Sequence, residues 1–226
     1  MKRLLTIFLT LALLAGLCAV PVGASDQALD TAYQKAAAFA VSALAHPGAA
    51  DDWAIMGVVR GGFTAPALWT DSYYRALAAK VQNAHGVLSK TRLTEYARAV
   101  LGLSAIGADP ANVAGYDLTA PLADFDTATQ AGITSAAYML LALDAGNYEM
   151  PAVEVGKTQA TRAMYVDFML GQQLSDGGWN FGMETSDPDV TAIVLQALAP
   201  YQTSTPVKNA VALGVTCLSK LQNDDG

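Results

Sequence analysis

The chain has 226 residues, of which 53% are hydrophobic and 15% are charged. This composition supports a sizeable buried core and excludes an intrinsically disordered chain, which would be poor in apolar residues. The formal net charge is −7, and an acidic protein is repelled by the phosphate backbone, so we expect no nucleic-acid partner.

Residues 1–24 have the three parts of a secretory signal peptide. Lys2 and Arg3 supply the positive start, Leu4 to Val20 form an apolar run, and Val22 to Ala24 offer small residues for cleavage. The alternative is an uncleaved anchor, because the apolar run is close to the shortest that spans a bilayer. Pro21, directly after the run, favours cleavage. We expect an exported protein, secreted or at the cell surface, with residues 25–226 as its mature domain and no stable membrane span.

The two cysteines are Cys18 and Cys217. Cys18 lies inside the predicted signal peptide, where Leu17 before it argues against a lipid-attachment site. Removal of the signal leaves Cys217, which alone makes neither an internal disulfide nor a cysteine-rich zinc site. We expect it to be a small buried residue on a helix.

Beyond residue 25, nearly every segment has apolar residues at helical spacing and conventional start and stop residues. Strand-like alternation is almost absent, so the sequence predicts an all-α fold. The predicted helices cover Gln27–Ala45, Asp52–Arg60, Asp71–His85, Thr94–Ile106, Thr134–Ala145, Gln159–Gln173, Pro188–Tyr201 and Pro206–Leu221.

Glycine and proline mark the ends of these helices. Pro47-Gly48, Gly61-Gly62, Gly107 and Gly146 are expected to stop helices, because glycine accepts the left-handed conformation that closes one. Asp187 and Thr205 are expected to cap helix starts, since each places a side-chain oxygen directly before a proline at the first helical position.

Four of the predicted helices share an apolar stripe rich in small residues. Aligning Val58, Ala105, Ala142 and Ala197 gives steps of 47, 37 and 55 residues. Each step spans two helices and a loop, so the repeating unit is a helix hairpin that buries its second helix only against neighbouring hairpins. The small residues let these inner helices approach closely.

A glycine-containing motif, Q-x-x-D-G-x-W, recurs near the end of the chain. It consists of Gln173, Asp176, Gly177 and Trp179, and its opening returns 49 residues later as Gln222 and Asp225. The glycine permits a tight turn where a helix stops, the amide and carboxylate can bond exposed backbone groups, and the indole can pack over the turn. We expect the motif to be structural, and the chain to be incomplete because it stops inside a repeat.

This motif resembles the repeat of the triterpene cyclases and protein prenyltransferases, whose hairpins close into an α/α toroid of inner and outer helices. The same fold occurs in the transcobalamin and intrinsic-factor group and in bacterial secreted or surface proteins similar to it, which this chain resembles most. The resemblance runs from about Asp51 to the end and is carried by Tyr96–Pro110, Leu141–Gly146, Gln173–Trp179 and Asp187–Tyr201. It implies an α/α toroid that lacks its closing hairpins, and it implies little about activity, because this fold carries unrelated functions.

The segment Asp187–Ala192 is similar to the Asp-x-Asp-Asp-Thr-Ala stretch with which squalene-type cyclases protonate an alkene. The resemblance would make Asp189 the general acid and Asp187 its partner, but Val190 stands at the third aspartate position. Clustered carboxylates keep one member protonated by like-charge repulsion, and losing one weakens this effect. The alternative needs no catalysis: Asp187 caps a helix, and Asp189 lies in its first turn, where the helix dipole favours a negative charge.

No metal site is predicted. Prenyltransferases hold zinc with Asp, Cys and His ligands at close range. Here the two histidines, His46 and His85, are expected at helix ends, and Cys217 has no histidine near it in sequence. The Gly-Cys-Gly-Glu-Gln signature of the complement-like thioester domains, which share the toroid, is absent from the sequence. We therefore expect no required cofactor.

The starts of the inner helices are expected to meet at one end of the toroid and form its mouth. Aromatic rings, carboxylates and hydroxyls there suit a large, partly polar ligand, although each aromatic could instead pack between hairpins. The predicted ligand-binding residues are Asp51, Asp52, Trp53, Thr94, Tyr96, Thr134, Trp179, Phe181, Asp189 and Thr191.

Three functions follow as hypotheses. The first is a secreted or cell-surface binding module that holds a corrinoid or similar large ligand without reaction, like the corrinoid carriers that the chain resembles. The second is a terpene cyclase-like enzyme of the squalene-cyclase family, with Asp189 and Asp187 as its catalytic residues. The third is a structural or adhesive surface domain with no small ligand. The resemblance to bacterial surface proteins also implies association with the cell wall through regions beyond Gly226.

Overall fold

The computed structural model describes residues 26–43, 47–48 and 51–223. The predicted signal peptide, His46 and Asp225 lie outside these residues. The described part is helical and contains isolated bridges but no β-strand, which confirms the predicted all-α class. In that same part, no helix is both long enough and apolar enough to cross a membrane.

The chain divides into two compact units. The first comprises the described residues of Met1–Leu88 and Ala99–Asp117, and the second those of Ser89–Arg98 and Leu118–Gly226. Helix α5 (Thr94–Ile106) contributes residues to both.

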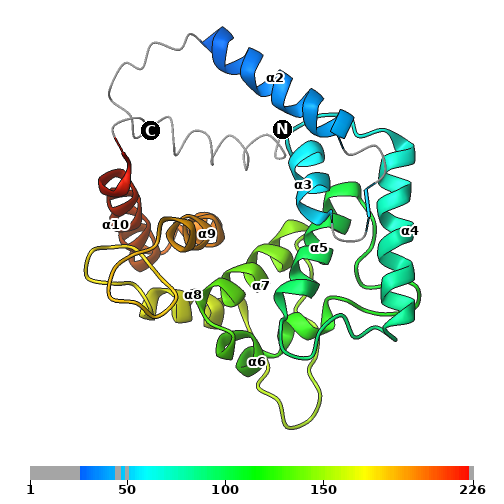
Figure 1. Cartoon of the computed structure of the whole chain (residues 1–226). Coiled ribbons are helices and arrows are strands. Elements are labelled where there is room, and N and C mark those ends of the chain that lie inside the picture. The colour runs from blue at the N-terminus through cyan, green and yellow to red at the C-terminus, as the bar shows by residue number, and fades with distance from the viewer. Residues whose placement is uncertain (1–25, 44–46, 49–50, 224–226) are drawn as a thin grey trace. The chain divides into compact units, whose positions relative to one another are not determined.

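The first unit contains α2 (Asp26–Ala43), α3 (Asp52–Arg60) and α4 (Ala67–Asn83) (Figure 1). Tyr33 ties α2 to the end of α3, because its hydroxyl donates to the Gly61 carbonyl at 2.6 Å and its ring lies 5.0 Å from that of Phe63. Tyr73 on α4 donates to the Asp52 carboxylate at 2.6 Å, and both side chains are buried. These contacts join the three helices through specific polar bonds as well as apolar packing.

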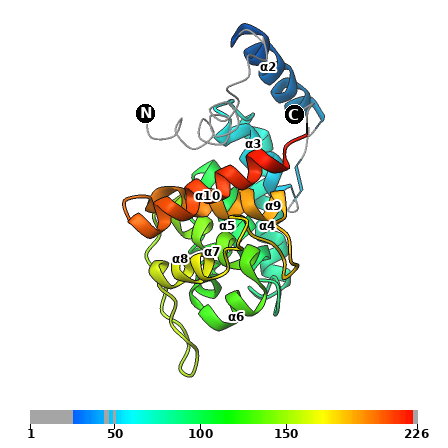
Figure 2. The same ribbon diagram turned by 90° about the vertical axis from the view of Figure 1, so that its left-hand side faces the viewer.

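Besides the start of α5 and the 3-10 segment η2 (Ala199–Tyr201), the described part of the second unit contains two short helices and four longer ones (Figures 1 and 2). The short helices are η1 (Ala120–Ala123) and α6 (Phe125–Gln130), and the longer ones are α7 (Ile133–Ala145), α8 (Arg162–Gly171), α9 (Pro188–Leu198) and α10 (Thr205–Leu221). Helix α7 packs against α9 and α8 packs against α10, while α8 also covers α7 and α10 also covers α9. The four helices therefore form two layers, α7 with α9 and α8 with α10.

A polar cluster around Asp144 links α7, α8 and η2 in the second unit. Arg162, at the start of α8, donates to the Asp144 carboxylate at 2.7 Å and to the backbone carbonyls of Leu143 and Tyr148, so it satisfies groups left open where α7 ends. Tyr201 donates to the other Asp144 oxygen at 2.8 Å. Burial and this carboxylate both raise the pKa of the Tyr201 hydroxyl, which remains a donor.

Several predicted boundaries are wrong by a few residues. Helix α4 starts at Ala67 instead of Asp71, and α8 starts at Arg162 instead of Gln159, because the Thr161 hydroxyl caps it by accepting from the Met164 amide. Helix α6 was not predicted. The last predicted turn of α9 is a 3-10 segment, η2 (Ala199–Tyr201).

Two predicted end signals also differ. Thr205 is the first residue of α10, and Ser204 before it is the N-cap and makes no side-chain cap bond. Gly146 does not adopt the left-handed conformation, which Asn147 takes instead with φ of 52°. A side chain at Gly146 would collide with the Tyr148 ring, so its glycine serves close packing.

Candidate functional site

The Q-x-x-D-G-x-W motif forms the turn that leaves α8. The Gln173 side chain donates to the carbonyls of Gly177, within the turn, at 2.7 Å and Ala210, on α10, at 2.8 Å. Gly177 has φ of 95°, and an added Cβ would come within 2.8 Å of the Leu213 carbonyl oxygen. Glycine is therefore required twice over, by backbone conformation and by the close approach of α10.

Asp176 fixes the far side of this turn. Its carboxylate accepts from the Gly178 amide at 3.2 Å and from the amide and hydroxyl of Ser186 at 3.1 and 2.5 Å. The Ser186 bond is the largest influence on the pKa of this carboxyl, which lies below its usual value. Asp176 thus links the turn at Gly178 to Ser186, at the end of the segment of residues 180–186.

Trp179 and Thr191 lie within the packed wall of the second unit, and neither faces an open cavity. The Trp179 ring is fully buried and donates through Nε1 to the Met169 carbonyl at 2.7 Å. The Thr191 hydroxyl, also buried, accepts from the Trp179 amide at 2.9 Å. The polar groups of both side chains are bonded within the fold, and their contact with a ligand stays a prediction.

The two aspartates of the Asp-Pro-Asp segment have different surroundings. Asp187 is the N-cap of α9, and its carboxylate accepts from the Val190 amide at 2.9 Å. Asp189 lies in the first turn and is exposed. Val190, at the position of the third cyclase aspartate, is buried. The segment is a capped helix start that carries one solvent-exposed carboxylate.

A well-braced loop precedes this helix start. Asn180 is nearly buried, and its amide nitrogen donates to the carbonyls of Met183 and Thr185, while its oxygen accepts from the amides of Gly182 and Met183 at 2.8 and 3.1 Å. The side chains of Phe181 and Met183 nonetheless remain 67% and 60% exposed. The loop therefore holds two large apolar side chains in solvent on a fixed backbone.

The other predicted contact residues divide between the two units. In the first unit, the Asp51 carboxylate accepts from the Gly48 amide, Asp52 is buried under Tyr73, and Trp53 is half exposed. The Asp52 side chain is buried and accepts from Tyr73, and its contact with a ligand stays a prediction. In the second unit, Thr94 and Thr134 are partly exposed and Tyr96 is buried.

The layer of α7 and α9 has one side that α8 and α10 do not cover. The partly or fully exposed positions on the two helices recur at helical spacing. We call this the open face: Thr134, Tyr138 and Leu141 on α7, and Asp189, Ile193 and Gln196 on α9. Thr134 and Asp189 were among the predicted ligand-binding residues.

The start of α5 brings an ion pair towards this face. Arg98 donates to Glu95 at 3.0 Å, and its charge acts on Tyr138. Burial raises the pKa of the Tyr138 hydroxyl, and the Arg98 charge offsets only part of that rise. The end of the open face at Tyr138 is therefore close enough to the Arg98–Glu95 ion pair of α5 to be influenced by its charge.

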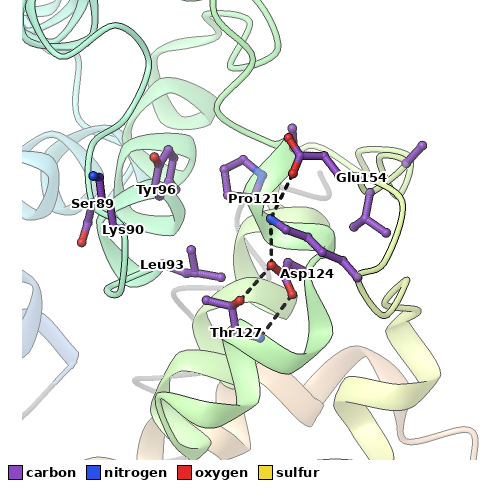
Figure 3. Close-up of a pocket in the computed structure, with 12 residues that line it drawn as sticks. Ser89, Lys90, Leu93, Tyr96, Pro121, Asp124, Thr127 and Glu154 are labelled. Carbon is purple, nitrogen blue, oxygen red and sulfur yellow. Dashed lines mark hydrogen bonds and ion pairs between the residues drawn. The ribbon is translucent and has the colours of Figure 1, made fainter.

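A separate pocket of about 320 Å³ lies in the second unit, between the segment before α5, the η1–α6 region and the loop of residues 152–157 (Figure 3). Apolar side chains form much of its wall, chiefly Leu93, Pro121 and Val153. Tyr96 also lines it, so this predicted site residue lies in a pocket, although not the one expected. We call it the Lys157 pocket, because the Lys157 ammonium lies at its wall.

Asp124 organises the charges of the Lys157 pocket. It caps α6, and its two oxygens accept from the amide and hydroxyl of Thr127 at 3.2 and 2.8 Å. Lys157 lies 3.1 Å from this carboxylate and 3.7 Å from that of Glu154. Burial alone would raise the pKa of Asp124, but the Thr127 bonds and the Lys157 charge bring it below its usual value.

Little in the sequence indicates this pocket. Its residues come from three separate segments of the chain, residues 89–96, 120–127 and 152–157, and the last of these carries no motif. The one local signal was Asp124 three residues before Thr127, which is the pattern of a helix cap. That signal would have identified α6 but not the pocket.

No protein-family model, curated protein or solved structure matches this chain. Among residues 26–43, 47–48 and 51–223, no group of three or more His, Cys, Asp or Glu side chains is arranged to hold a metal ion. The candidate binding surfaces among the described residues are the braced loop with its neighbouring open face and the Lys157 pocket.

Proposed function

We propose that this chain is a secreted or cell-surface binding module of the α/α-toroid type, which holds a large, partly polar ligand without reaction. Two features support the toroid arrangement. The second unit has paired layers, α7 with α9 and α8 with α10, as in two adjacent hairpins of inner and outer helices. The motif of residues 173–179 fixes the turn between such hairpins, and its opening recurs 49 residues later.

The observation that carries the binding function is the braced loop. Phe181 and Met183 would be expected to turn inward if the loop could move, because exposing them to water is unfavourable. Asn180 prevents this by bonding the loop backbone on both of its amide atoms. A loop held in this way presents its apolar side chains at little further entropic cost, which favours binding.

The surroundings of the loop indicate the chemistry of the ligand. Glu184 and Asp189 are exposed close to the two apolar side chains in sequence. A ligand that contacts all four needs an apolar face for Phe181 and Met183 and hydrogen-bond donors for the carboxylates. A corrinoid, which has a broad ring and peripheral amides, is one candidate of this kind.

The cyclase alternative has less support. A carboxylic acid that protonates an alkene must keep its proton, which requires burial or a close second carboxylate. Asp189 is exposed, Asp187 is committed to the cap of α9, and Val190 occupies the third position. The pair is accounted for by capping and by a favourable charge at a helix start.

The test is an equilibrium titration of the full chain with cyanocobalamin, followed by tryptophan fluorescence and by visible absorbance. We compare the wild type with a Phe181→Ala/Met183→Ala double variant. Full burial of either side chain is worth about 1.5–3 kcal/mol, so partial burial of both predicts a loss of affinity of roughly 10- to 100-fold.

Leu213→Ala is the matched control, because Leu213 is also a large exposed apolar residue of the second unit, at 55%, but lies on α10. It should bind like the wild type. Wild-type protein that shows no saturable change at micromolar cyanocobalamin excludes the corrinoid version of the proposal. Conversion of squalene by the wild type, lost in Asp189→Asn, would replace it with the cyclase.

A further inference from the structure

The Lys157 pocket has the composition of a second ligand site, distinct from the braced loop. Its volume of about 320 Å³ is at the lower end of the range for small-molecule sites. At about 30 Å³ per water-sized group, it accommodates roughly ten heavy atoms. A corrinoid is far larger than this, so the pocket and the proposed corrinoid surface would serve different ligands.

The charge that remains available in this pocket is positive. The Asp124 carboxylate already accepts from the amide and hydroxyl of Thr127 and is paired with Lys157, and only 9% of its side chain is exposed. It therefore acts as an anchor that holds the Lys157 ammonium at the pocket wall. An ammonium has three donor hydrogens, so Lys157 can accept another anionic partner while it keeps Asp124.

The present second partner of Lys157 is weakly held. The Glu154 carboxylate is 3.7 Å away and its side chain is 85% exposed, so this pair is worth little in water. A ligand carboxylate that enters from the pocket can take its place without breaking the Asp124 contact.

A second cation lies across the pocket. Lys90 is exposed, lines the wall opposite Asp124 and Glu154 (Figure 3), and makes no ion pair with any described residue. Leu93 and Pro121 lie between Lys90 and the side of the pocket with Asp124 and Glu154, and they add apolar surface (Figure 3). Two lysines, one of them anchored, above an apolar wall match a small anion that carries a short hydrocarbon chain.

We propose that the Lys157 pocket binds a small monocarboxylate with a short apolar chain, whose carboxylate bonds Lys157 in place of Glu154 and whose chain packs on Leu93 and Pro121, while Lys90 adds positive potential from the opposite wall. The binding is reversible and involves no covalent step. It does not depend on the corrinoid function or on Phe181.

The test is a calorimetric and NMR titration of the full chain with hexanoate. Hexanol and inorganic phosphate serve as comparison ligands, because each has only one of the two recognised features. We expect saturable binding of hexanoate with a Kd below about 10 mM, and at least tenfold weaker binding of both comparison ligands. Hexanol binding as tightly as hexanoate would refute the role of the lysines, and phosphate binding as tightly would refute the role of the apolar wall.

Variants locate the site. Lys157→Gln should weaken hexanoate binding about tenfold or more, since it removes a charge-assisted hydrogen bond, and Lys90→Gln about two- to fivefold. Lys208→Gln, an exposed lysine on α10, is the matched control and should change nothing. Lys90→Gln removes no contact within the described structure, so it keeps the proposal testable if Lys157→Gln fails to fold. Hexanoate affinity unchanged in Lys90→Gln, or absent saturable binding by the wild type, overturns the proposal.

Discussion

Trp179→Ala tests the structural role assigned to the repeat motif. The ring is fully buried and packs against α10, where a Cβ on Gly214 would come within 2.7 Å of it. Replacing such a tryptophan by alanine costs about 3–5 kcal/mol of unfolding free energy through lost burial and the remaining cavity. Trp179→Phe keeps most of the burial and loses the bond to the Met169 carbonyl. That carbonyl still accepts from the Gln172 amide, so the expected cost is only about 1–2 kcal/mol.

The assay is urea unfolding followed by far-ultraviolet circular dichroism, with stabilities compared at equal slope. Phe181→Ala is the matched control, because Phe181 is an aromatic two residues away that is mostly exposed. It should change the stability by no more than about 0.5 kcal/mol. A loss of unfolding free energy below about 1 kcal/mol in Trp179→Ala would contradict the structural role of the motif. An equal loss in Phe181→Ala and Trp179→Ala would contradict it as well.

Three further predictions concern stability. Asp187→Ala should lower the unfolding free energy by about 1 kcal/mol because it removes the α9 cap, whereas Asp189→Ala should lower it by less than about 0.5 kcal/mol; equal losses in urea unfolding would contradict this difference. Burial opposes ionisation of Asp124, but its cap bonds and ion pair outweigh it and lower the folded-state pKa below 3.8. The contribution of ionised Asp124 to the unfolding free energy is therefore complete above about pH 4 and is lost as the pH falls through the folded-state pKa. Asp124→Asn should flatten the loss of stability between about pH 5 and pH 2. The same loss of stability over this pH range in the variant and the wild type would count against this. Arg162→Met removes donors from the Asp144 carboxylate and two backbone carbonyls and should cost about 1.5–3 kcal/mol by thermal unfolding; a melting curve like that of the wild type would show that these bonds contribute nothing.

The parts of the fold that could be predicted are those with strong local signals. Helices α3 and α5 have the predicted bounds, because apolar periodicity and glycine ends agree there. The start of α9 follows from Asp187 and Pro188, whose effect is purely local. The start of α4 was missed because Pro66 is its N-cap without a side-chain bond, so no capping residue marks it in the sequence.

Helix α6 was missed for a different reason. It has six residues, too few to display an apolar stripe, and it depends on contacts distant in sequence. Its first amide, on Phe125, donates to the Thr158 carbonyl at 3.1 Å, and Asp126 accepts from the Thr158 hydroxyl at 2.6 Å. The Asp124 cap before Thr127 was its one local signal, and tertiary contacts such as these have no signature in a local window.

The sequence does not show which side chains are buried, and this limited the prediction of the site. Trp179 and Phe181 are two residues apart and both aromatic, so the sequence could not separate them. In the structure the first is buried and bonded to Met169, while the second stands in solvent because Asn180 braces the loop. Asp52 was assigned to a ligand for the same reason, since its bond to Tyr73 joins residues 21 positions apart.

The most direct test of the proposed binding module is amide hydrogen exchange of the full chain with and without saturating cyanocobalamin. The proposed binding surface predicts added protection in the loop of residues 180–186 and at the start of α9, with little change on α10. Protection confined to other segments, or exchange that is the same with and without the ligand, would contradict the claim that Phe181 and Met183 form its contact surface.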